Sequence, residues 1–262
     1  MNIHPTAIID PQAELGKNVT VKPFAVIEGG TQIGDDCTIG AYVVIRTGTS
    51  LGTGTEVHTG AVLGEPPQDM KYKGQESYLK IGCYNHIREF ATIHRASSEG
   101  ESTQIGDRNL LMAYSHIGHD VVLGSNIIMA NNVGISGHCV IEDNVNIGGM
   151  VGVHQFVTIG TTAMVGGFSK IVRDVPPYTI VDGNPARPRG LNTRGLQRHN
   201  MSPQQIAALK HAYRLLFRSD LNVSDAVSKI LEESEPTAEV KRLIDFMLRI
   251  DEGYGGRQLD PH

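Results

Sequence analysis

Five histidines in the middle of the chain are the side chains best suited to do chemistry: His94, His116, His119, His138 and His154. Imidazole changes its charge near neutral pH, so it can act as a general base, and in its neutral form it can bind a metal ion. Which role is open to each histidine depends on whether its side chain faces the interior or a surface. The elements that carry these residues must therefore be predicted first.

A six-residue repeat dominates the sequence on both sides of these histidines. It begins at Ile3 and runs to Leu63, and it is unbroken from Ile105 to Ile171, where every sixth residue is aliphatic or Met. Neither the helical period of 3.6 nor the strand period of 2 produces this spacing. A fixed short period is typical of a solenoid whose coils bury their apolar faces against neighbouring coils. Small residues often stand two positions before the aliphatic one, so both are expected to point inward.

Three such six-residue segments would close one triangular coil, and two stretches interrupt this pattern. They cover Gly64–Leu79 and His94–Gln104, and the repeat resumes in phase after each. Insertions in a solenoid usually emerge as loops on one side, often the binding side, so these two are candidate walls of an active site. The alternative is a pair of tolerated surface excursions. The charged side chains in and around them favour a function: Asp69, Lys71, Lys73, His94 and Arg95.

The repeat stops near Val175, where Pro176 and Pro177 cannot donate to a strand ladder. A connector rich in Gly, Asn, Pro and Arg follows, and Ser202-Pro203 then predicts the start of a helix. A second helix is expected over Ser224–Leu231 and a third after Pro236. The predicted organisation is a β-solenoid over residues 1–190, with loops near 64–79 and 94–104, and a helical domain over 191–262.

The repeat places none of the five histidines at an inward position, which argues against buried core histidines and leaves solvated or interfacial ones as the alternative. Residues that are three six-residue segments apart occupy the same place in adjacent coils, so they are expected to be neighbours in the stack. His119 should lie beneath Gly137 and Gln155, and Asp120 beneath His138. A base, a carboxylate and an accessible backbone N–H together have the outline of an acyl-transfer site. His119 is the first candidate for the base, followed by His138 and His116.

A metal site is the competing interpretation of the same histidines. Three outward imidazoles, contributed by two subunits, could bind zinc, because neutral imidazole is a common zinc ligand. The spacing alone leaves both interpretations open.

Charge and hydropathy restrict the partners. The formal net charge of −5 argues against a general nucleic-acid-binding protein. The sequence has neither a signal peptide nor the ~20 consecutive apolar residues of a membrane span, so we expect a soluble cytoplasmic protein. Residues 183–219 contain no Asp or Glu but seven basic residues, which favours a phosphate-bearing ligand or an acidic partner protein. These are Arg187, Arg189, Arg194, Arg198, Lys210, Arg214 and Arg218.

Several segments make the chain similar to a known family over essentially its full length. They are GEPPQDMKYKG, IREFATIHR, NLLMAYSHIGHD, ANNVGISGH, GVHQF and DVPPYTIVDGNPA. Together they resemble the bacterial UDP-N-acetylglucosamine O-acyltransferases. The resemblance implies a mainly β fold, a left-handed parallel β-helix of hexapeptide repeats followed by a small α-helical C-terminal domain. It also implies a homotrimer with active sites in clefts between subunits.

The resemblance further implies the reaction: transfer of an (R)-3-hydroxyacyl group from acyl carrier protein to the 3-hydroxyl of UDP-N-acetylglucosamine, the first step of lipid A biosynthesis. No cofactor is implied, because the thioester is already activated. By motif, His119 would be the general base, Asp120 would orient it, and the Gly137 N–H would hold the oxyanion. The implied substrate contacts are Gln68, Asp69, Lys71, His116, His138, Gln155, Asn192 and Arg198. Gly167 matches the position where side-chain bulk limits acyl length, and Gly favours a longer chain.

Two positions depart from the family pattern, which commonly has Glu at Arg194 and a basic residue at His199, and both bear on the nucleotide contacts. Some relatives use a diamino analogue of the sugar. The related UDP-sugar N-acyltransferase of the same pathway is the nearest alternative, although it normally has an extra N-terminal domain, whereas here the repeats begin at Ile3. Alternatives of other classes are a hexapeptide carbonic anhydrase with interfacial zinc and a non-catalytic trimeric scaffold.

Overall fold

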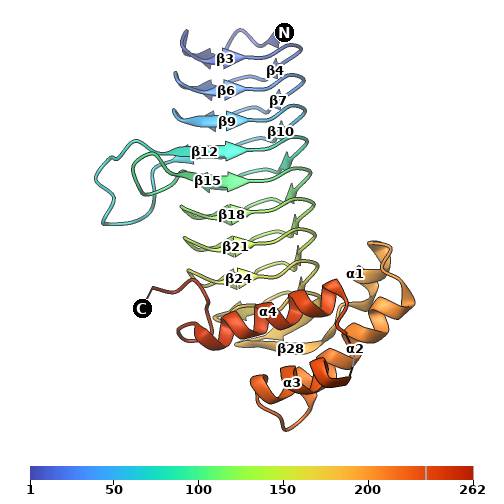
Figure 1. Ribbon diagram of the computed structural model, residues 1–262. Coiled ribbons are helices and arrows are strands. Elements are labelled where there is room, and N and C mark those ends of the chain that lie inside the picture. Colours follow the sequence, from blue (N-terminus) through green and yellow to red (C-terminus); the bar gives the residue numbers. More distant parts are fainter. Residues whose placement is uncertain (234, 262) are drawn as a thin grey trace.

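The computed structural model describes residues 1–233 and 235–261, and it shows a stack of triangular coils that ends in a group of helices (Figure 1). Strands two to six residues long lie in three sheets, which we call faces A, B and C in chain order. Within the regular coils each strand pairs in parallel with its equivalent in the next coil, three strands further along the chain, as Asn2 in β1 pairs with Thr20 in β4. The predicted coil of three six-residue segments is therefore confirmed.

The strand bounds follow this order of faces. Face A contains β1 (Asn2–Ile3), β4 (Thr20–Val21), β7 (Thr38–Ile39), β10 (Glu56–Val57), β13 (His86–Ile87), β16 (Leu110–Leu111), β19 (Ile128–Met129), β22 (Asn146–Ile147), β25 (Met164–Val165), β27 (Thr179–Gly183) and β28 (Ala186–Leu191). Face B contains β2 (Ile8–Ile9), β5 (Val26–Ile27), β8 (Val44–Ile45), β11 (Val62–Glu65), β14 (Thr92–His94), β17 (His116–Ile117), β20 (Gly134–Ile135), β23 (Gly152–Val153) and β26 (Lys170–Ile171). Face C contains β3 (Glu14–Leu15), β6 (Gln32–Ile33), β9 (Thr49–Leu51), β12 (Tyr78–Ile81), β15 (Ser102–Ile105), β18 (Val122–Leu123), β21 (Val140–Ile141) and β24 (Thr158–Ile159).

The core of the prism contains the residues that the repeat predicts to point inward. Val19 with Val21, Cys37 with Ile39, and Cys139 with Ile141 are all at most 1% exposed. Each pair is an aliphatic residue and the small or branched residue two positions before it, as expected for alternate positions of a strand. Successive coils bury these pairs against one another in a single continuous cluster.

The corners of the prism use glycine for close stacking between coils. In the regular coils, the glycine that often follows the aliphatic residue does not provide the left-handed backbone conformation of the turn. That conformation occurs two positions later, in residues such as Asp120 and His138, with φ of 58° and 59°. The glycine permits close stacking: a Cβ on Gly34 would lie 2.7 Å from the backbone nitrogen of Thr53 in the next coil.

The last turns of the solenoid differ from the prediction that the prolines end it. Val175 forms a bridge with Ile159, and β27 pairs in parallel with β25, so face A continues beyond Pro177. β28 then returns antiparallel to β27 and ends at Leu191, one residue past the expected domain boundary. This hairpin has no hexapeptide spacing, which is why the repeat did not predict it.

Four helices follow: α1 (Thr193–Arg198), α2 (Pro203–Arg218), α3 (Val223–Glu233) and α4 (Ala238–Glu252). Ser202 caps α2 as predicted, and its hydroxyl accepts a hydrogen bond from the Gln205 N–H. The prediction missed α1, whose six residues carry only one buried side chain, Leu196. The helices pack together through their own apolar cluster at the C-terminal end of the stack (Figure 1). None of the described helices is long and apolar enough to cross a membrane.

Candidate active site

One edge of the prism, between faces B and C, carries most of the candidate residues. His119 and Asp120 occupy the turn from β17 to β18, and Gly137 and His138 occupy the equivalent turn from β20 to β21. Gln155 lies at the same corner of the next coil. Both loop insertions leave this edge too, between β11 and β12 and between β14 and β15, and they project together from the side of the stack (Figure 1). The predicted clustering and the one-sided placement of the loops are therefore observed.

His119 and Asp120 form a direct pair. The Nδ1 atom of His119 lies 2.7 Å from Oδ2 of Asp120, and each side chain is 15% exposed. Burial alone would raise the pKa of Asp120, but hydrogen bonds from His119 and Ser97 outweigh it and hold this pKa at about 2. Because the carboxylate is ionised, it accepts the proton on Nδ1, so the Nε2 atom of His119 keeps its lone pair.

Ser97, in the second loop, is a partner of Asp120 that the repeat did not predict. Its backbone N–H donates to Oδ1 of Asp120 at 3.0 Å, and its hydroxyl donates to Oδ2 at 2.6 Å. The loop residue thus fixes the carboxylate that fixes His119. Ser97 lies outside the six-residue register, so counting coils could not find it.

Gly137 lies directly against the His119 ring, as the count from coil to coil predicts. A Cβ at residue 137 would lie 2.7 Å from both Cε1 and Nε2 of His119, closer than side-chain carbons approach one another, so only glycine leaves the ring in place. Within the described residues the Gly137 N–H has no acceptor. A backbone donor and an imidazole nitrogen therefore lie side by side on adjacent coils.

His138 is the second imidazole of the cluster. Its Nε2 lies 3.6 Å from Oδ2 of Asp120, and its ring stacks on Phe156 with 4.8 Å between centroids. Burial lowers the pKa of His138, although the negative charge of Asp120 opposes this shift. His119, Asp120 and His138 together also present a set of donors that could bind a metal ion.

A cleft of about 530 Å³ opens over this edge. It is lined by six residues that the sequence indicated: Gln68, Asp69, Lys71, His119, His138 and Gln155. His154, Phe156 and the C-terminal tail complete it, the tail through Tyr254, Arg257, Asp260 and Pro261. The tail is anchored where Arg257 donates to the Val172 carbonyl at 2.8 Å and Gln258 N–H donates to Asp174 at 2.9 Å. No spacing or motif in the tail marks it as part of a site.

Two further histidines lie next to this cleft. His116 contacts the Thr92 hydroxyl through Nδ1 at 2.8 Å and borders a shallow groove on face B, where Gly134 and Gly152 leave open space. His94 is only 7% exposed, so the expectation that no histidine is buried is wrong for this residue. It is covered by the first loop, whose Pro66 carbonyl lies 2.6 Å from its Nδ1, and not by the core of the prism.

The residues expected at the nucleotide lie elsewhere. Asn192 and Arg198 border a separate cavity of about 430 Å³ beside face A, together with Arg194 and His199. Asn192 is 5% exposed and caps α1, accepting from the Gly195 N–H at 3.0 Å and donating to the Thr162 carbonyl at 2.8 Å. A single chain therefore does not bring this group to the His119 cleft.

The edge between faces A and B carries Gly167, which is exposed and lies beside Phe168. Large apolar side chains at the corners of this edge are 49–75% exposed, and two pairs of them stack at 5.1 and 5.2 Å. They are Phe24, Tyr42, Phe90, Tyr114, Met150 and Phe168. Gly60 and Asn132 interrupt this apolar strip, and exposed apolar side chains gathered in this way are typical of a surface that another protein covers. Gly167 is thus also outside the cleft of its own chain.

Comparison with known proteins places this geometry in a family. The model of bacterial hexapeptide transferases matches residues 30–65 and 102–137, and the model of the second domain of UDP-N-acetylglucosamine O-acyltransferase matches residues 174–254. A relative from Paraburkholderia phymatum, named acyl-[acyl-carrier-protein]–UDP-N-acetylglucosamine O-acyltransferase, is 48% identical over 256 residues, which cover 96% of this chain and 98% of the relative.

A relative of the same name from Synechocystis is 53% identical over 178 residues, covering 68% of this chain and 64% of the relative. Among solved structures, the UDP-N-acetylglucosamine O-acyltransferase of Moraxella catarrhalis superposes with a TM-score of 0.89 at 42% identity, covering 94% of this chain and 96% of the other. The fold is thus the left-handed parallel β-helix with a small helical C-terminal part. The chain belongs to the acyl-[acyl-carrier-protein]–UDP-N-acetylglucosamine O-acyltransferase family.

Proposed function

We propose that the chain transfers an (R)-3-hydroxyacyl group from acyl carrier protein to the 3-hydroxyl of UDP-N-acetylglucosamine, the first step of lipid A biosynthesis. Family membership supports the reaction, and the stacking of His119 against Gly137 supports the chemistry. The base and the oxyanion donor lie together at the edge of one cleft, which is the arrangement that acyl transfer to a hydroxyl requires.

In the proposed mechanism, Nε2 of His119 takes the proton of the sugar hydroxyl as its oxygen attacks the thioester carbonyl carbon. The new C–O bond produces a tetrahedral oxyanion, which the Gly137 N–H stabilises. When the C–S bond breaks, the protonated His119 returns its proton to the leaving thiolate. Asp120 keeps the ring in the required tautomer and stabilises the imidazolium. The donors and acceptors are all side chains, backbone and substrates, so this path uses no cofactor.

The substrate contacts are proposed by position. Gln68, Asp69, Lys71, His138 and Gln155 line the cleft and would contact the sugar and acyl groups. His116 would contact the sugar from the adjoining groove. Arg198 would hold the diphosphate, while Asn192 fixes the start of α1 and contributes indirectly. The seven basic residues from Arg187 to Arg218 are all exposed, so they suit an acidic carrier protein or a phosphate group.

A homotrimer with sites between subunits is part of the proposal. Arg198 and Gly167 lie away from the cleft of their own chain, so a neighbouring subunit would have to supply them. The exposed apolar strip from Phe24 to Phe168 gives each subunit a surface to bury against its neighbour. A cytoplasmic location fits the proposed carrier-protein substrate.

The test is to incubate the purified chain with UDP-N-acetylglucosamine and a panel of 3-hydroxyacyl carrier proteins of increasing chain length, then measure product masses. We expect a singly O-acylated sugar nucleotide, with a longer acyl chain preferred because Gly167 adds no side-chain bulk. Transfer only to the 3-amino analogue would replace the sugar assignment. The absence of acylated product from every donor would contradict the proposed function.

A further inference from the structure

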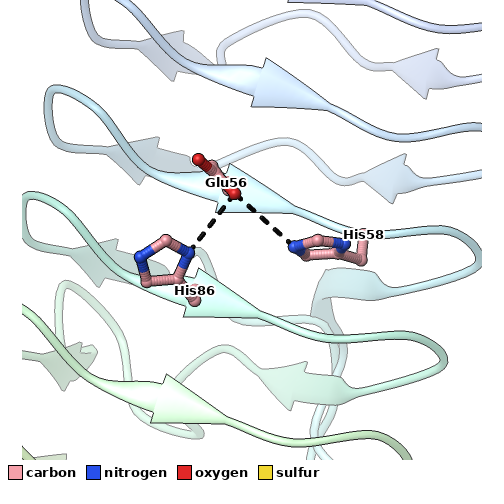
Figure 2. Close-up of side chains that lie close together, drawn as sticks. All are labelled: Glu56, His58 and His86. Atoms are coloured by element: carbon pink, nitrogen blue, oxygen red, sulfur yellow. Dashed lines mark ion pairs between the residues drawn. The ribbon is translucent and has the colours of Figure 1, made fainter.

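A second cluster of ligating side chains lies on face A, away from the cleft. Glu56 on β10 and His86 on β13 are directly paired across adjacent coils, and His58 follows β10 by one residue (Figure 2). The two imidazoles approach the same carboxylate oxygen from different sides (Figure 2). None of these residues takes part in the proposed acyl transfer. The cluster therefore needs a separate explanation.

The distances fit ligands that share one ion. Oε2 of Glu56 lies 3.3 Å from Nδ1 of His86 and 3.7 Å from Nε2 of His58, and all three donor atoms lie within 4.8 Å of one another. Two ligands about 2.1 Å from a tetrahedral zinc ion stand roughly 3.4 Å apart. Within the described residues, neither imidazole–carboxylate contact has hydrogen-bond geometry. The two imidazole nitrogens and the carboxylate oxygen are thus arranged around a common point, and they are not hydrogen-bonded to one another.

A second carboxylate stands behind the cluster. Oε1 of Glu89 lies 4.0 Å from Nδ1 of His58, the ring nitrogen that faces away from Glu56. Arg88 holds Glu89 through two hydrogen bonds of 3.1 and 2.9 Å. Metal-bound imidazoles usually donate their other N–H to a carboxylate, which fixes the ring and strengthens the bond to the metal. At 4.0 Å Glu89 does not yet accept this hydrogen bond, but a small side-chain movement would bring it to this role.

We propose that Glu56, His58 and His86 bind a late first-row divalent metal ion such as Zn²⁺. Two imidazoles and one carboxylate suit such ions and not the oxygen-preferring Mg²⁺ or Ca²⁺. The side chains are 31–51% exposed, so an ion can enter from solvent and water can complete its coordination. The main chain is already fixed, because Glu56 N–H and His58 N–H donate to the next coil at 2.8 Å.

The proposed ion would act as a clamp between coils. β10 and β13 belong to the coils that precede and follow the first loop insertion, which contributes Gln68, Asp69 and Lys71 to the cleft. An ion at free concentration c that binds only the folded chain stabilises it by RT ln(1 + c/Kd), so Tm should keep rising as the ion concentration increases beyond the Kd.

The test is a calorimetric titration of tag-free, chelator-treated protein with Zn²⁺ at neutral pH, with Mg²⁺ as the comparison ion. Both titrations use a His119→Ala background, which removes one donor from the cluster in the cleft. We expect one Zn²⁺ bound per chain through this cluster, an upward shift of Tm with Zn²⁺, and no response to Mg²⁺. His58→Gln with His86→Gln should weaken this binding at least tenfold and abolish the Tm shift, while His4→Gln, an exposed histidine elsewhere, should change neither.

Glu56→Gln keeps the size of the side chain and removes only its charge, so it tests the site even if the double variant folds poorly. It should also weaken Zn²⁺ binding about tenfold. Unchanged stoichiometry and affinity in Glu56→Gln would overturn the proposal. Equal responses of the parent protein to Zn²⁺ and Mg²⁺ would also overturn it.

Discussion

At the scale of single residues, the chemistry depends on one contact between coils. His119 lies against the Cα of Gly137, and Asp120 holds the other side of the imidazole at 2.7 Å. The proposed base is thus held between a carboxylate from its own turn and a glycine from the next. In the proposed mechanism, residue 137 must be small for the ring to stay, and its N–H must be free for the oxyanion.

Gly137→Ala tests this contact. The added methyl group would displace His119 by colliding with Cε1 and Nε2, so we expect kcat to fall about a hundredfold with little change in Tm. Steady-state kinetics and thermal melting measure the two effects. Gly190→Ala is the matched control, because a Cβ there meets no atom within 4 Å. Normal kcat in Gly137→Ala would mean that the ring position is not critical.

Ser97→Ala tests the support of Asp120 by the second loop. The variant loses the hydroxyl hydrogen bond of 2.6 Å but keeps the backbone N–H bond. The pKa of Asp120 should rise from about 2, and kcat should fall roughly threefold to tenfold because the His119 tautomer is less firmly held. A pH–rate profile should show this loss of kcat increasing as the pH is lowered toward the range in which Asp120 takes up a proton. Ser98 is the exposed neighbouring serine, so Ser98→Ala is the control and should leave the profile unchanged. An unchanged profile in Ser97→Ala would mean that Ser97 has only a structural role.

The six-residue repeat predicted the neighbours within this site for those residues that belong to regular coils. Stacking of His119 with Gly137 and of Asp120 with His138 follows from a constant coil of three six-residue segments. Ser97 and Arg257 could not be placed in this way. One lies in an insertion and the other in the tail, where no period relates position in the chain to position in space.

At the scale of elements, the two loops determine the environment of the histidines. The first loop covers His94. This side chain points away from the core of the prism, but the loop buries it. The register predicted the outward direction of this side chain but not its burial, because burial here depends on the fold of an irregular segment. The tail after α4 similarly closes the far side of the cleft.

The pH dependence of stability belongs to this scale. Burial lowers the pKa values of His94, His116 and His138 in the folded chain, so below pH 6.5 these three groups bind more protons in the unfolded chain than in the folded one. Burial raises the pKa of Asp174 to about 6 and acts in the opposite direction, but it is one group against three. Stability should therefore fall as the pH decreases from 7 toward 5. Tm measured across this range checks the sign. His94→Gln should flatten the dependence relative to His4→Gln, and a Tm that rises toward pH 5 in the parent would contradict the assignment.

At the scale of the whole molecule, the proposed site is incomplete in one chain. The cleft with His119 and the cavity with Arg198 border different parts of the prism, on the B–C edge and beside face A. The repeat could predict each coil, but contacts between subunits have no period in the sequence. The proposed trimer and its shared site therefore rest on the resemblance to the family and not on the repeat.

Mixed assemblies test the shared site. His119→Ala and Arg198→Ala chains should each be inactive alone, whereas co-refolded mixtures should regain activity at about a quarter of the sites, where intact His119 meets intact Arg198 from a neighbour. Light scattering measures the assembly, and product formation measures the rescue. If both residues served the same site from one chain, mixing would restore nothing.

Whether His119 is the general base of acyl transfer can be measured with a single variant. His119→Ala is compared with the parent chain for the rate of 3-O-acyl-UDP-N-acetylglucosamine formation, with Tm and oligomeric mass recorded on the same samples. If His119 is the general base, this rate should fall by about 10²–10⁴-fold while Tm and oligomeric mass stay unchanged. Turnover within a few-fold of the parent would mean that His119 is not the base.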